Sequence, residues 1–216
     1  PGEEVTAILV DDPVAVYVNA VGLSKAVVPI VGNGVLETLQ ANVDAIVQAG
    51  GIASLTAPYY RSSFDHHSLV QVEGATLLDI YNAHPSNILG DPRTFSYEEL
   101  WDEFLTAGKN IFGTANDDAH NYLEFSTDNS NPGRAWVMAR CRALTPNSVV
   151  EALRSGDFYA STGIRLDKLE STSESISLTI DPKFAQSYST TFIGLQGAVL
   201  YEQQGTEVRY EIKGDE

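Results

Sequence analysis

The sequence predicts an α/β domain with parallel strands, followed by a smaller all-β domain. Up to about Gly163, short β-rich segments alternate with segments whose apolar residues recur at helical spacing. Strands that alternate with amphipathic helices favour parallel pairing through crossovers, and therefore a doubly wound sheet or a barrel. After Gly163 the helical period disappears and only short strand-like segments remain. We therefore divide the chain into residues 1–163 and residues 164–216.

The helices of the first domain are indicated by periodicity and by their terminal residues. Ser96 and Glu99 have the spacing of a capping box, and Thr145-Pro146 places a cap before a proline at the first helical position. Gly156 is a typical residue to end that last helix. The expected helices cover residues 34–49, 96–108 and 145–156. The expected strands cover residues 6–10, 14–23, 52–55, 76–81, 110–114 and 135–142.

The second domain is predicted from short β-rich segments separated by turns. The expected strands cover residues 166–169, 175–180, 190–195, 198–201 and 208–212. The chain begins at Pro1 without an initiator Met and stops within the strand pattern at Glu216. We therefore expect a fragment whose β-domain lacks its last strands.

Composition excludes several classes of function. A net charge of -16 and a pI near 4.5 argue against nonspecific binding to nucleic acid or to an anionic membrane. No segment approaches the roughly 20 apolar residues that cross a bilayer. The single Cys141 excludes an internal disulfide framework and a Cys-rich zinc site. Strong acidity is typical of secreted proteins, so we expect a secreted or periplasmic location. The oligomeric state is left open.

The candidate site follows from the rule that functional groups gather beyond the carboxyl ends of parallel strands. Asp117, Asp118 and His120 follow one expected strand, and Asn82 and His84 follow another. A carboxylate and an imidazole two residues apart can bind one cation, and both suit Zn²⁺, Mn²⁺ or Fe²⁺. Read without further context, Asp-Asp is equally a turn, and the two histidines are surface, capping or turn residues.

Four motifs in a fixed order strengthen the metal interpretation. They are WDEFLTAG at 101–108, FGTANDDAH at 112–120, PGRAWV at 132–137 and GDFYASTG at 156–163. Together they resemble the PHP (polymerase and histidinol phosphatase) superfamily and its CehA/McbA-like metallohydrolase branch, over nearly all of the chain to Gly163. The resemblance implies a distorted (β/α)7 barrel, here partial, with two or three divalent metal ions. Such metals would activate water to hydrolyse a phosphoester or ester bond of a small molecule.

The resemblance also implies roles for individual residues. Glu4 matches the glutamate of the family's G-x-E-x-[S/T] strand, and Asp118 and His120 match its late D-x-H pair, so these three residues are expected metal ligands. The early H-x-H of the family would precede Pro1, in keeping with a truncated sequence.

The remaining candidate residues are assigned to substrate and proton chemistry. Asp117 and His84 are expected to act in proton transfer, while Arg134 and Asn82 are expected to contact substrate, Arg134 through an anionic group.

Two departures from the family pattern leave a second interpretation open. Tyr17 and Ala57 stand where the family has histidines, and Ala57 cannot bind a metal. Loss of such ligands weakens a site, so reduced metal occupancy is expected. The main hypothesis is a metal-dependent hydrolase. The alternative is a degenerate, non-catalytic PHP-fold protein that serves as a binding or scaffold module. In a third hypothesis, the β-domain binds carbohydrate or protein and the first domain supports it.

Overall fold

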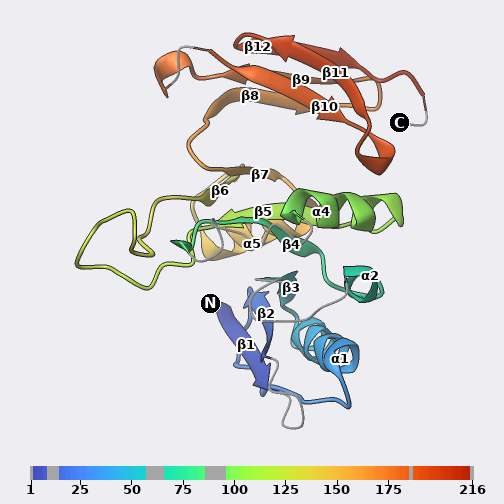
Figure 1. Ribbon diagram of the computed structural model, residues 1–216, viewed down its shortest axis with the longest axis vertical. Coiled ribbons are helices and arrows are strands. Elements are labelled where there is room, and N and C mark those ends of the chain that lie inside the picture. The colour runs from blue at the N-terminus through green and yellow to red at the C-terminus, as the bar shows by residue number, and fades with distance from the viewer. Residues whose placement is uncertain (1, 9–14, 57–65, 86–95, 185–186, 215–216) are drawn as a thin grey trace. The chain divides into compact units, whose positions relative to one another are not determined.

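The computed structural model describes residues 2–8, 15–56, 66–85, 96–184 and 187–214 (Figure 1). The chain divides into two compact units, Pro1–Ala160 and Ser161–Glu216. The division lies a few residues before the boundary proposed from the sequence at 163. Within the described residues, no helix is both long and apolar enough to cross a membrane.

The largest sheet of the first unit is a five-stranded mixed sheet (Figure 1). Its strands are β1 (Gly2–Ile8), β2 (Ala15–Val21), β3 (Ile52–Leu55), β4 (Leu77–Asn82) and β5 (Phe112–Asn116). They lie in the sheet in the same order as in the chain. The β1–β2 and β2–β3 pairs are antiparallel, whereas β3–β4 and β4–β5 are parallel.

The predicted (β/α)7 barrel is wrong. The described strands are distributed over several small sheets, and β6 (Trp136–Ala139) and β7 (Phe158–Ser161) form a separate two-stranded sheet. A parallel pair needs a crossover of about a dozen residues or more, and only residues 9–14 separate β1 from β2. No described helix lies in residues 117–135 between β5 and β6. The strand–helix alternation assumed for the barrel therefore fails at both ends of the first unit.

The predicted helices are confirmed as local elements. They are α1 (Val35–Gln48), α4 (Tyr97–Thr106) and α5 (Pro146–Ser155), and a single turn, α2 (His66–Leu69), adds to them. Both hydrogen bonds of the capping box between Ser96 and Glu99 are present at the start of α4. Gly156 ends α5 with φ 73, and a Cβ there would lie 2.3 Å from the ring of Phe112. Both the left-handed backbone and the close ring contact therefore require glycine.

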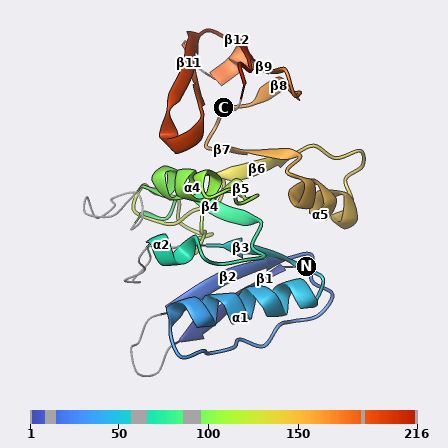
Figure 2. The same cartoon turned by 90° about the vertical axis from the view of Figure 1, so that its right-hand side faces the viewer.

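Helices cover both faces of the sheet (Figure 2). Val43 and Ile46 of α1 and Phe104 of α4 belong to a buried cluster that includes Val18 and Leu55 of the sheet. On the other face, Leu153 of α5 packs in a cluster with Ile52 and Leu77. Because consecutive strand residues point to opposite faces, β3 and β4 contribute side chains to both clusters. Their near-continuous apolar sequence reflects this position.

Among its described residues, the second unit consists of strands and short 3₁₀ turns; the strands were predicted and the 3₁₀ turns were not. Its strands are β8 (Leu166–Ser171), β9 (Ser175–Ile180), β10 (Ser189–Ile193), β11 (Val199–Gln204) and β12 (Glu207–Glu211). One antiparallel sheet has the order β12-β9-β8 and the other pairs β10 with β11. Phe192, Val208 and Tyr210 form its buried core.

Candidate functional site

The candidate site lies at the carboxyl ends of the parallel strands β4 and β5. Asn82 and Asn116 are the last residues of these strands and are paired in register. The backbone N–H of Ala83 donates to the Asn116 carbonyl over 2.9 Å. The chain that leaves β4 towards His84 therefore runs beside the chain that leaves β5 towards Asp118.

The loop after β5 holds Asp118 and His120 in a fixed local conformation. Asp118 has φ 47, in the left-handed region that Asp adopts more readily than most residues. The His120 Nδ1 atom lies 2.6 Å from the Asp118 carbonyl oxygen and 3.6 Å from Asp118 Oδ1. Because a carbonyl can only accept, Nδ1 carries the proton, and in the neutral ring Nε2 keeps its lone pair. The Ser130 hydroxyl donates to the same carbonyl and fixes it further.

Asn82, the last residue of β4, and His84, just beyond it, join this pair. The Asn82 Nδ2 atom donates to Asp118 Oδ2 over 3.3 Å, and Asn82 Oδ1 accepts from the backbone N–H of His84 over 2.9 Å. The rings of His84 and His120 meet edge to face, with 5.6 Å between their centroids and 88° between their planes. The structure thus brings together four residues that the sequence singled out.

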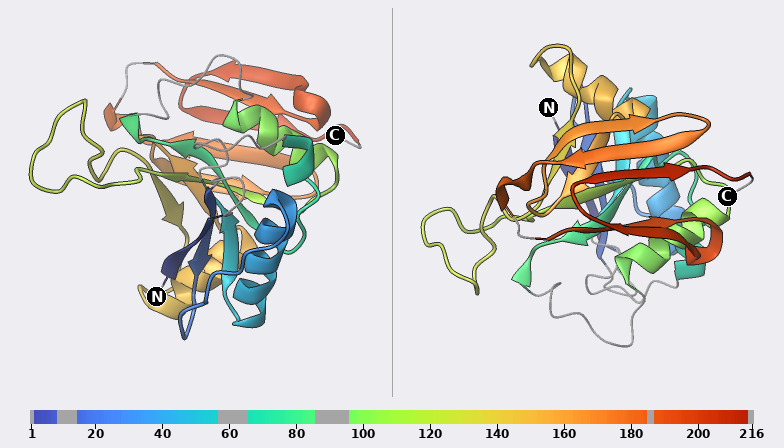
Figure 3. Two further views of the ribbon diagram at one scale, coloured as in Figure 1. Left: turned by 60° about the horizontal axis from the view of Figure 1, so that its bottom comes forward. Right: turned by 90° about the horizontal axis from the view of Figure 1, so that it is seen from above.

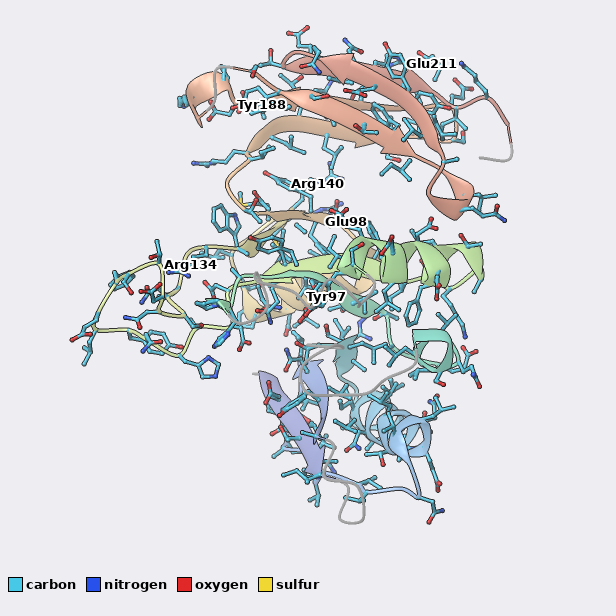
Figure 4. All side chains as sticks on the ribbon, in the orientation of Figure 1. Tyr97, Glu98, Arg134, Arg140, Tyr188 and Glu211 are labelled. Carbon is cyan, nitrogen blue, oxygen red and sulfur yellow. The ribbon has the colours of Figure 1, made fainter. Side chains whose placement is uncertain are left out.

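Asp117 and Arg134 lie at the two ends of the long loop that joins β5 to β6. This loop extends away from the sheet in both views of Figure 3. Asp117 Oδ2 accepts from the backbone N–H of Gly133 over 2.5 Å, which closes the base of the loop. Arg134, labelled in Figure 4, donates to the Ser126 carbonyl and, over 3.2 Å, to Asn131 Oδ1. Part of the Arg134 guanidinium is therefore engaged by its own loop.

Glu4 is not brought together with Asp118 and His120. It is an exposed residue of β1, which β2, β3 and β4 separate from β5, and its Oε1 accepts from the Thr6 hydroxyl over 3.1 Å. Its role as a metal ligand stays a prediction. Tyr17 lies on β2 opposite Thr6. Ala57 lies outside the described residues.

Sequence reasoning missed a buried carboxylate close to the site. Asp79 of β4 is 3% exposed, and its oxygens accept from the hydroxyls of Thr56 and Thr114, the latter over 3.0 Å. Burial, and then the negative charges of Asp79 and Asp118, raise the pKa of Tyr97 to about 12. The sequence signal for Asp79 was a charged residue inside the apolar run Leu77–Ile80. Such a run predicts a buried strand, and a buried Asp almost always has hydrogen-bonding or charged partners, so Asp79 could have been predicted to bond to neighbouring strands.

The fit of these residues to a metal ion is partial. Asp118, His120 and His84 have the donor types that Zn²⁺ or Fe²⁺ prefers. Among the described residues, however, no three His, Cys, Asp or Glu side chains are placed so that they could hold a metal ion. Since a catalytic zinc site uses three protein ligands, the described residues do not form a complete metal site.

Comparison with known proteins gives one similar solved structure. No family model matches the chain, and no curated protein matches it. The chain is similar to a two-domain protein from Bacteroides vulgatus that contains a "predicted PHP-like metal-dependent phosphoesterase", with a TM-score of 0.45 and 12% identity. The match covers 97% of this chain and 64% of that one, so this chain spans less than two thirds of its length. At this TM-score the similarity does not establish a shared fold.

Proposed function

We propose that the protein is a metal-dependent hydrolase that cleaves an ester or phosphoester bond of a small molecule. The observation that carries the proposal is the meeting of Asn82, His84, Asp118 and His120 beyond two adjacent parallel strands. Membership of the PHP superfamily and of its CehA/McbA-like branch is part of the proposal. It rests on the four sequence motifs at 101–108, 112–120, 132–137 and 156–163 and on their order.

The chain's own residues support distinct tasks in such a site. Asp118 and His120 would supply two metal ligands, and the Asn82 amide would orient the Asp118 carboxylate. His84 is half-buried beside His120 and would accept or donate the proton in the hydrolysis step. Zn²⁺, Mn²⁺ and Fe²⁺ are the ions that suit these donors, and a complete site needs at least one further ligand.

The test combines metal analysis with hydrolysis assays on the full-length protein. Phosphomonoesters, phosphodiesters and aryl esters form the substrate panel. The Asp118→Asn variant should lose about 100-fold or more in kcat/KM together with bound metal, because losing even an outer partner of a metal site typically costs 10- to 100-fold. Asn also tolerates the left-handed backbone of position 118, so the fold should be retained.

Asp128→Asn is the matched control. Asp128 is exposed on the same loop, and the substitution removes the same charge without touching the site. Metal and turnover that persist in Asp118→Asn would contradict the assignment of Asp118. Wild-type protein with neither metal nor turnover would instead favour the non-catalytic binding module.

A further inference from the structure

Asp79 is a buried charge that joins three strands. It lies on β4, the strand between β3 and β5, and is 3% exposed. A buried carboxylate is costly unless its oxygens accept hydrogen bonds. Oδ2 accepts from Thr56, directly after β3, and Oδ1 accepts from Thr114 on β5 over 3.0 Å. One side chain thereby connects all three parallel strands.

The backbone changes register directly after Asp79. Asp79 pairs with Thr114, but Tyr81 pairs with Ala115 and Asn82 with Asn116, so an extra residue is accommodated around Ile80. Bulges of this kind re-aim side chains and occur next to functional sites. Without this extra residue, Asn82 would not arrive opposite Asn116, the position from which its chain reaches the Asp118 loop.

The packing around Ile80 stabilises this irregular register. The side chain of Ile80 lies over Gly113, where a Cβ would come within 2.6 Å of its Cδ1 atom. Because Gly113 has no side chain, there is room beside it for the extra residue at Ile80. Asp79 on one side and Ile80 over Gly113 on the other hold the last residues of β4.

Tyr97 connects Asp79 with the site electrostatically. It is the first residue of α4, a helix whose start is fixed by the capping box, and Figure 4 shows it on the side of α4 near β4. The charges of Asp79 and Asp118 both contribute to the raised pKa of its hydroxyl. The buried carboxylate and the candidate site thus act on the same side chain.

We propose that Asp79 is a positioning residue of the candidate site. Its carboxylate, held by Thr56 and Thr114, fixes β3, β4 and β5 in the register that brings Asn82 to Asp118. Asp79 is too deeply buried to contact substrate, so it acts through Asn82. The catalytic consequence rests on the proposed function, whereas the geometric one does not.

Hydrogen exchange in the full-length protein tests the geometric consequence. In Asp79→Asn, one acceptor oxygen becomes an NH2 group, so at least one threonine bond is lost or rearranged. We expect the backbone amides of Ala83 and His84, which bond to Asn116 and Asn82, to exchange about tenfold faster. Amides in the middle of α1, such as that of Val43, should change little. Equal acceleration throughout would show that Asp79 only stabilises the fold and would overturn the proposal.

A second variant and a matched control keep the test decisive. The triple variant D79L/T56V/T114V replaces the polar cluster by apolar side chains, which preserves a packed core. It should show the same local acceleration. Asn42→Leu removes another buried polar side chain, one that bonds to Ile30 and Thr38, and should leave Ala83 and His84 unchanged. Unchanged exchange at both amides in D79N and in the triple variant would also overturn the proposal.

Kinetics separate this inference from the proposed function. If the wild type hydrolyses a substrate of the panel, D79N should lower kcat about tenfold while KM changes less than about twofold. Faster local exchange in D79N with no wild-type hydrolysis would reject the proposed function and leave the positioning role standing. A tenfold fall of kcat without local exchange changes would reject the positioning role alone.

Discussion

At the scale of one residue, the pKa of the Tyr97 hydroxyl reports on burial and negative charge beside the site. Burial and two neighbouring carboxylates raise its pKa from the ordinary 10 to about 12. Between these values the folded protein keeps a proton that the unfolded chain releases. The free energy of unfolding should therefore fall as the pH rises from 10 to 12, by about 2 kcal/mol at most.

Comparison with Tyr97→Phe isolates this contribution from that of the other tyrosines. Denaturant unfolding at pH 9, 10 and 11 should give a shallower decline in Tyr97→Phe than in the wild type, since the ring is kept and only the titrating group is lost. Below pH 9 the pH dependence of the two proteins should be parallel. Parallel curves up to pH 11 would contradict the raised pKa.

The positions of single residues could be predicted where they depend on nearby sequence. Asp118, His120, Asn82 and His84 lie at or just beyond the ends of strands, so the carboxyl-end rule selected them before any pairing was known, and their roles stay predictions. Tyr97 opens a helix, and its approach to Asp79 and Asp118 depends on how that helix packs. Glu4 was assigned by its motif alone, and the sheet order places its strand at the far edge from β5.

The capping box of α4 supplies a prediction at the scale of an element. Ser96→Ala removes the hydroxyl that accepts from the Glu99 N–H, which should cost about 1 kcal/mol of unfolding free energy. Because Tyr97 is the next residue, fraying of this turn should also bring its pKa back towards 10. Denaturant unfolding and a spectroscopic tyrosine titration of the same variant measure both effects.

Thr145→Ala is the matched control for that loss. Thr145 caps α5 through the Ser148 N–H over 3.2 Å, so its removal should cost a similar free energy. The titration of Tyr97 should stay as in the wild type, because α5 does not carry that residue. An unmoved Tyr97 pKa in Ser96→Ala would show that the capping box does not position the tyrosine.

Elements were predicted better than their connections. Helix ends depend on caps and glycines that lie within a few residues, and β3, α4 and α5 were placed within two residues of their observed starts. Strand direction depends on what lies between the strands, and the sequence periodicity did not reveal that β2 pairs antiparallel with both neighbours. The strand β7 follows α5 after a glycine and was not predicted as a strand.

At the scale of the whole molecule, each unit has its own buried cluster. The clusters of the first unit draw on α1, α4, α5 and the mixed sheet, whereas Phe192, Val208 and Tyr210 form the core of the second. In that core, the rings of Phe192 and Tyr210 stack with 5.1 Å between centroids. A unit as short as Ser161–Glu216 has little apolar area to bury, so this cluster carries much of its stability.

Phe192→Ala should therefore unfold the second unit while the first unit stays folded. Removing a buried Phe costs about 3–5 kcal/mol, which is comparable to the whole stability that a domain of this size usually has. Hydrogen exchange should show lost protection in β9 and β12 but wild-type protection in α1. Ile193→Ala is the control, because Ile193 lies on the same strand and is 63% exposed, so both units should keep their protection. Loss of protection in α1 as well would mean that the two units unfold as one. The packing defect in the second core would then have destabilised a cluster of the first unit that shares none of its residues.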